Sequence, residues 1–156
     1  MLLRIVRNLT SEEVEQKIKD FEKEFCMSFE KFEELFLNQK LDGKYSRVYF
    51  EWAELVDSYR GYIEEGTLDY TVEEVRDLTP KQVALLTPRR IELLFLIAAL
   101  RVESINDLAQ KARRNVKNVH QDLQVLSQLG FVRLSKQRGR ALIPETLVKE
   151  ITFSIR

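Results

Sequence analysis

The sequence has very few of the side chains from which catalytic and metal sites are most often built. Its 156 residues include one cysteine, Cys26, and one histidine, His120. A single cysteine excludes a disulfide framework within one chain and a cysteine-rich zinc site, and a single histidine excludes a metal site made of several histidines. A serine hydrolase, which uses a histidine as its base, is also disfavoured. We therefore expect no enzyme activity, no catalytic residues, no metal and no other cofactor.

Glycine and long apolar runs are scarce as well. Five glycines leave little material for a phosphate-binding loop, and neither G-x-G-x-x-G nor a Walker A string occurs. No apolar run approaches the roughly 18 residues that a membrane helix needs. The opening MLLRIVRNLT is too short and too soon interrupted by charge to be a secretory signal. We expect a cytoplasmic protein without a membrane partner, since a reducing compartment suits one unpaired thiol.

The net charge of zero conceals two halves of opposite sign. Residues 1–78 carry 11 Lys and Arg against 19 Asp and Glu, a net charge of −8, whereas residues 79–156 carry 14 against 6, a net charge of +8. Such asymmetry suggests two regions with different partners. We expect residues 1–78 to be an acidic partner-binding or dimerisation region and residues 79–156 to be a nucleic-acid-binding domain. Two ordinary solvated faces are the alternative.

The first half predicts a strand followed by three helices. Residues 1–9 alternate in the manner of a short strand. Thr10 and Ser28 are placed to cap two helices whose apolar residues recur every three or four positions, and a third helix is expected over about residues 47–65. Residues 67–78 form a connector that fits either a turn of helix or a brief strand.

Aromatic residues are concentrated in this half. All five tyrosines, the single tryptophan and six of the nine phenylalanines lie between Phe21 and Tyr70. Three short helices do not easily bury so many rings, so part of the apolar stripe is a candidate surface for a partner protein. Packing of the rings on each other or on the second half is the alternative. The candidate partner-binding residues are Phe25, Phe29, Phe32, Phe36, Trp52, Leu55 and Tyr59.

The second half predicts a helix–turn–helix. Thr87 and Pro88 open a helix that is apolar on nearly all sides, so we expect it at the buried centre of a domain. Ser104 caps the next helix, and a polar turn at residues 113–115 leads into a longer one that Gly130 closes. The inner face of this last helix is predicted to consist of Val116, Val119, Leu123 and Leu126.

Two short strands follow the helix–turn–helix. Residues 131–135 and 140–143 flank a basic turn, which predicts the wing of a winged helix. The expected fold class is therefore mostly α with a small β component (α+β), in which a winged helix–turn–helix domain follows a helical segment with a short leading strand. The chain ends in an alternating strand, EITFSIR, which could pair with the N-terminal strand or with its own copy in a homodimer.

The helix–turn–helix segment is strongly basic. From Lys111 to Arg140 it holds eight Lys and Arg against one acid, Asp122. Basic side chains suit phosphates, and Asn and Gln suit the edge of adenine, so we expect double-stranded DNA as the partner. The alternative to a DNA contact for His120 is a partly buried ring bonded to Asp122 or to a carbonyl. The alternative to DNA binding for the domain is a winged helix that contacts only proteins. The candidate DNA-binding residues are Arg113, Arg114, Asn115, Lys117, Asn118, His120, Gln121, Lys136, Arg138 and Arg140.

The string from TPRRIELLFLIAAL through VHQDLQVLSQLGFVRL to the final strand resembles archaeal and bacterial predicted transcriptional regulators with a MarR-like winged helix. The resemblance covers residues 79–156 and implies DNA binding. The matching residues are Thr87, Pro88, Ser104, Leu108, Ala109, Val119, His120, Asp122, Leu129, Gly130 and Pro144.

The segment from FEKEFCMSFEKFEELF to FEWAELVDSYRGY is similar to the toxin-binding segment of small prokaryotic antitoxins. It departs from that pattern where Phe25-Cys26 replaces a Tyr-Gly pair and where Lys44-Tyr45 interrupts an acidic stretch. Together the two resemblances imply a transcriptional repressor that is the antitoxin of a toxin–antitoxin pair, neutralises a basic toxin and represses its own operon. A stand-alone cellular or viral regulator, whose N-terminal helices only dimerise, is the alternative.

Overall fold

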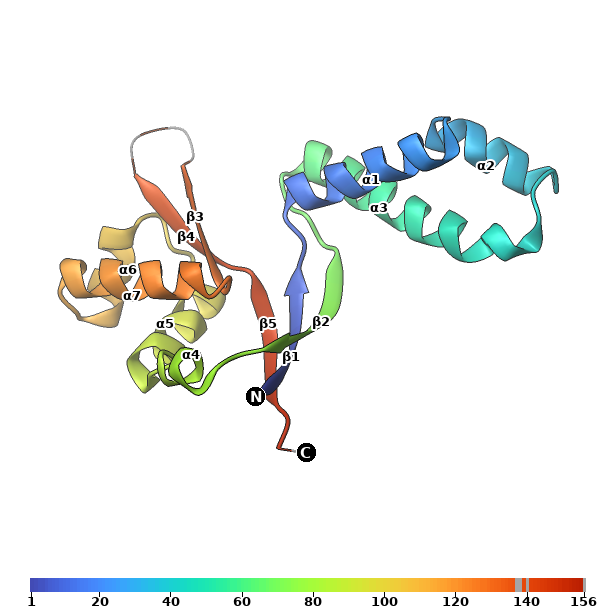
Figure 1. Cartoon of the computed structure of the whole chain (residues 1–156). Helices are drawn as coiled ribbons and strands as arrows, with labels where there is room; N and C mark the ends of the chain where they lie inside the picture. The colour runs from blue at the N-terminus through green and yellow to red at the C-terminus, as the bar shows by residue number, and fades with distance from the viewer. Residues whose placement is uncertain (137–138, 140, 156) are drawn as a thin grey trace. The chain divides into compact units, whose positions relative to one another are not determined.

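The computed structural model describes residues 1–136, 139 and 141–155, and these residues form a mixed α+β fold, as the sequence predicts (Figure 1). No helix among the described residues is long and apolar enough to cross a membrane. The helices are α1 (Ser11–Phe25), α2 (Phe29–Leu37), α3 (Ser46–Glu65), α4 (Pro80–Ala84), α5 (Pro88–Ala99), α6 (Ile105–Ala112) and α7 (Val116–Gln128), with a short 3-10 turn at Gly43–Tyr45. The strands are β1 (Leu2–Asn8), β2 (Thr71–Asp77), β3 (Val132–Lys136), β4 (Leu142–Thr146) and β5 (Val148–Phe153).

The chain forms two compact units whose boundaries differ from the predicted division after residue 78. The helical unit consists of Asn8–Val72, and the mixed unit combines Met1–Arg7 with Glu73–Arg156. The difference has a physical cause: β1 pairs with strands from later in the chain, so the first residues fold with the C-terminal half. By sequence, the helical unit carries 8 Lys and Arg against 16 Asp and Glu, and the mixed unit carries 17 against 9.

Local capping defines the helices of the helical unit. The Thr10 hydroxyl accepts a hydrogen bond from the Glu13 amide at 3.2 Å, while the Glu13 carboxylate accepts one from the Thr10 amide, which completes a capping box at the start of α1. Ser28 caps α2 through the amide of Lys31. Gly66 ends α3 with a φ of 78°, a left-handed conformation that favours glycine.

The core of the helical unit is largely aromatic. Trp52 is fully buried and stacks on Phe21 at a centroid distance of 5.3 Å. Phe32 lies 5.1 Å from the same indole, and Phe29 lies 5.6 Å from it. A second cluster is centred on Leu55, together with Leu9 and Val14. The rings thus pack on one another within this unit.

A three-stranded sheet of order β2-β1-β5 lies in the mixed unit. β1 pairs antiparallel with β5, with Leu3 opposite Phe153 and Ile5 opposite Ile151, and both Leu3 and Ile5 are fully buried. The C-terminal strand therefore pairs with the N-terminal strand, one of the two pairings considered from the sequence. The connector over residues 67–78 resolves into a strand, β2.

Helix α5 is exposed on one side, so the expectation that it lies at the buried centre of its domain is wrong. Leu93 and Ile97 face the core, whereas the Phe95 side chain is 71% exposed. A helix that is apolar all round does not indicate which side will be covered. Its open side and β5 line a groove of about 310 Å³, which includes Leu86, Ile91, Leu94, Phe95, Ala98, Val148, Ile151 and Phe153.

Candidate nucleic-acid interface

Two capped helices joined by a tight turn form the candidate interface. The Ser104 hydroxyl accepts a hydrogen bond from the Asp107 amide at 3.0 Å and begins α6. Arg113 ends α6 in the left-handed conformation, with a φ of 54°. Two residues later the Asn115 side-chain oxygen accepts a hydrogen bond from the Lys117 amide at 2.8 Å and begins α7. A turn of only three residues therefore sets the direction of α7 relative to α6.

The packing of α6 on α7 decides which side chains reach solvent. Val119, Leu123 and Leu126 of α7 are fully buried, as predicted, and so is Leu108 of α6. Val116 is 43% exposed, so its predicted place on the inner face is wrong. It lies at the first position of α7, where the helices line an open hollow rather than packed core. The exposed side of α7 carries Lys117, Asn118, Gln121 and Gln124.

The single acid of this segment, Asp122, pairs with two arginines. Asp122 accepts a hydrogen bond from Arg90 Nε of α5 at 3.0 Å and another from Arg114 Nη2 at 2.6 Å. The Asp122 and Arg114 side chains are only 14% and 13% exposed. Arg114, predicted to contact phosphate, instead ties the turn before α7 to Asp122 within that helix, while Arg113 beside it is exposed. An isolated acid in a basic segment is the feature of the sequence that could have predicted this pairing.

His120 does not form the bond with Asp122 that the sequence suggested as an alternative. The two carboxylate oxygens of Asp122 accept hydrogen bonds from Arg90 and Arg114 instead. The ring is half-buried and has no hydrogen-bond partner among the described residues. Asn115, predicted to read bases, is exposed, but its side-chain oxygen is engaged in capping α7.

The β3–β4 hairpin follows α7 directly. Val132 pairs with Thr146 at its base, and Lys136 pairs with Leu142 near its tip. Phe131 and Val132 are buried and hold the base against the core of the mixed unit. Lys136 is exposed, as a wing contact requires. The other two predicted wing residues, Arg138 and Arg140, lie outside the described residues.

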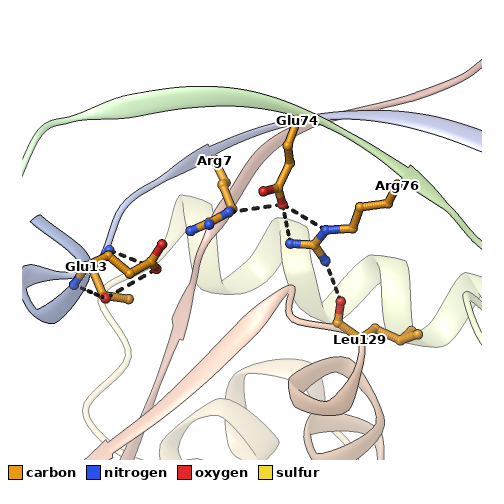
Figure 2. A network of polar contacts seen from close by, with 6 residues as sticks. Arg7, Glu13, Glu74, Arg76 and Leu129 are labelled. Atoms are coloured by element: carbon orange, nitrogen blue, oxygen red, sulfur yellow. Dashed lines mark hydrogen bonds and ion pairs between the residues drawn. The ribbon is translucent and has the colours of Figure 1, made fainter. Parts of the chain in front are cut away.

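A polar network missed by the sequence reading meets α7 at its C-terminal end (Figure 2). Arg76 of β2 donates a hydrogen bond from Nη1 to the Leu129 carbonyl oxygen at 2.7 Å. Glu74 accepts one from Arg76 Nε at 2.8 Å and one from Arg7 Nε at 3.1 Å. The alternation of TVEEVRD places Glu74 and Arg76 on one face of a strand, which was the available signal.

The charge of Glu74 is stabilised by these arginines. Partial burial raises the pKa of the Glu74 carboxyl, but the hydrogen bonds and positive charges of Arg76 and Arg7 outweigh that effect and bring the pKa below its ordinary value of 4.5. Glu74 is therefore a carboxylate at neutral pH, held between two guanidinium groups.

Most of the predicted partner-binding stripe lies inside the helical unit. Phe32, Trp52 and Leu55 are fully buried, so their predicted exposure is wrong. Phe29 is also buried, and Phe25, Phe36 and Tyr59 are half-buried. The cause is mutual packing of rings from three helices, which no single helix pattern reveals. The large apolar side chains that this unit exposes most are Leu37, Phe50 and Ile63.

The basic segment lies in a part of the chain that is similar to a known sequence family. A model of the HVO_A0114 family matches residues 85–153, which is less than half of the chain. The comparison with curated proteins and the comparison with solved structures found no match. Among the described residues, no group of three or more His, Cys, Asp or Glu side chains could hold a metal ion.

Proposed function

We propose that the mixed unit binds double-stranded DNA as a winged helix–turn–helix, with α7 in the major groove and the β3–β4 hairpin as the wing. The observation that supports this most is the separation of charge around α7. Its only acid, Asp122, is neutralised by Arg90 and Arg114 on the packed side, while Lys117 remains on the exposed side. A face that displays a cation and carboxamides and hides its carboxylate suits a polyanion.

Specific contacts are assigned by chemistry. Asn118 and Gln121 are exposed carboxamides on α7, suited to bidentate bonds with adenine. Arg113, Lys117 and Lys136 are exposed cations, suited to phosphates. The mixed unit has a net charge of +8 by sequence, which favours association with DNA.

The biological role proposed with this activity is transcriptional repression in the cytoplasm, by the antitoxin of a toxin–antitoxin pair. The helical unit, with a net charge of −8, would bind a basic toxin. Because the residues of the predicted stripe are buried or half-buried, exposed side chains such as Phe50 and Leu37 are better candidates for that contact. A stand-alone regulator is the second candidate. Co-expression with the product of the neighbouring gene separates the two, since only the antitoxin should form a complex with it.

A homodimer completes the proposal, and the groove between α5 and β5 is the surface that fits a second copy. Its lining is apolar apart from Thr146 and one charge of each sign, Lys149 and Glu150. Two mixed units of net charge +8 repel one another elsewhere, so a neutral apolar face favours contact between copies. A two-fold dimer would present two α7 helices to successive turns of DNA.

Fluorescence anisotropy with a duplex from the gene's own upstream region tests DNA binding directly. We expect binding that weakens steeply as salt rises. Asn118→Ala should weaken the free energy of binding to that duplex by roughly 1–3 kcal/mol, and to a scrambled duplex by much less. Lys117→Ala should weaken binding to both duplexes and lower the salt slope. Lys81→Ala, which removes a cation from exposed α4, is the matched control and should leave the salt slope intact. Absence of salt-dependent binding by the intact chain contradicts the proposal.

A further inference from the structure

The C-terminal end of α7 is held from outside the helix. The last carbonyls of any helix lack partners within it. Here the carbonyl of Leu129, the residue that caps α7, accepts a hydrogen bond from Arg76 Nη1 at 2.7 Å. A cation at this end also interacts favourably with the helix dipole. Arg76 belongs to β2, 53 positions earlier in the chain, so the contact joins α7 to the sheet.

Arg76 is itself fixed in place by a second layer of contacts. Glu74 accepts hydrogen bonds from both Nε and Nη2 of Arg76, and it accepts a third from Arg7 on the adjacent strand β1. Figure 2 shows the resulting chain from Arg7 through Glu74 and Arg76 to Leu129. The three charged side chains are between 15% and 30% exposed, so solvent screens them only in part.

The two residues after Leu129, Gly130 and Phe131, lie close to the Arg76 guanidinium. Its Cζ lies 5.7 Å from the centre of the Phe131 ring, within the range of a cation–π contact. A Cβ on Gly130 would lie 3.0 Å from Arg76 Nη1, so glycine leaves the room that the guanidinium occupies. Phe131 immediately precedes β3. One side chain thus contacts both the end of α7 and the start of the hairpin.

We infer that Arg76 is a positioning residue for DNA binding, which holds α7 and the β3–β4 hairpin in their docking orientation while Glu74 holds Arg76. The inference rests on the proposed function, because it assigns α7 and the hairpin to the DNA-contacting surface. It adds that β1 and β2, the strands that connect the two units in the chain, determine the geometry of that surface.

Glu74→Met distinguishes a positioning role from simple electrostatics, because the two predict opposite changes in DNA affinity. Removing a negative charge should strengthen binding to DNA if charge alone matters. Removing the anchor of Arg76 should weaken it, by about tenfold, the size of one lost charge-assisted hydrogen bond. Glu73→Met is the matched control, because Glu73 is the neighbouring exposed carboxylate and pairs with Arg4 instead of Arg76. Arg76→Lys keeps the charge but replaces three guanidinium nitrogens, which reach Glu74 and Leu129 at once, with one ammonium nitrogen. It is the second variant to measure if Glu74→Met fails to fold.

Hydrogen exchange of the intact chain provides a measurement that does not depend on DNA. The amides of Leu129, Gly130 and Phe131 donate to carbonyls of the last turns of α7, and we expect them to exchange about tenfold faster in Glu74→Met and Arg76→Lys than in Glu73→Met. Unchanged exchange would show that Glu74 and Arg76 do not hold the end of α7, and would overturn the clamp that these two side chains are inferred to form. Faster exchange with unchanged DNA affinity overturns its positioning role. If the unmodified chain binds no DNA, the proposed function and the positioning role fail together, whereas the clamp is still decided by exchange.

Discussion

At the scale of single residues, the one acid in the basic segment decides how one of its cations is used. Asp122 draws Arg114 away from solvent and connects α7 to α5 through Arg90. Counting charges along the sequence therefore overestimates the cations available to DNA. Arg114 counts as a cation in the sequence but is an internal support in the structure.

Replacing Asp122 tests this support. Asp122→Asn should lower the free energy of unfolding by about 1.5–3 kcal/mol, since two partly buried guanidinium groups lose their charged partner. The same change makes the segment more positive, so lower stability would not reflect weaker attraction for DNA. Urea denaturation followed by circular dichroism measures the effect. Glu145→Gln on β4, an exposed acid, is the control and should be nearly neutral. Equal stability of the two variants would contradict the supporting role.

Two glycines with the same backbone conformation should differ in how well they tolerate a side chain. Gly66 and Gly130 have φ values of 78° and 77°, but only Gly130 has a neighbour, Arg76, within 4 Å of an added Cβ. Alanine at either position should lower the free energy of unfolding by about 1–2 kcal/mol, because alanine disfavours the left-handed conformation. Gly130→Ala should cost more, because the Arg76 guanidinium must also move. Chemical denaturation of the two variants measures the difference, and an equal cost would show that Arg76 moves aside freely.

At the scale of elements, local chemistry made the helix starts predictable, whereas burial depended on contacts between distant segments. Thr10, Ser28 and Ser104 cap helices as their sequence contexts indicate, because a cap is a contact over three residues. Trp52 faces the core because rings from α1 and α2 cover it, and the sequence of α3 alone does not predict those contacts. For the same reason the uniform apolar pattern of α5 predicted a buried helix without revealing its open side.

At the scale of the whole molecule, the two structural units carry the same net charges, −8 and +8, as the two halves of the sequence, although their boundaries differ. The excess of acid lies in Asn8–Val72 and the excess of base in the mixed unit. Two strands of the mixed unit come from the acidic half of the sequence, and their residues in that unit contribute three arginines and three acids, so the net charge is unchanged. Linear composition showed that two regions exist, but the antiparallel pairing of β1 with β5 determined where they divide.

Assembly of whole chains should depend on one of two exposed phenylalanines. Phe95 and Phe50 are comparably exposed, at 71% and 61%, but Phe95 lies in the neutral apolar groove of the mixed unit and Phe50 lies on the acidic helical unit. If the groove joins two copies, Phe95→Ser should convert a dimer to a monomer and weaken DNA binding, because only a dimer engages two half-sites at once. Phe50→Ser, the matched loss of one exposed ring, should leave both the dimer and DNA binding intact, since like charge disfavours contact between two acidic units. Light scattering over a range of protein concentrations measures the mass. A monomeric unmodified chain, or a dimer that survives Phe95→Ser but dissociates with Phe50→Ser, would rule out the groove as the interface.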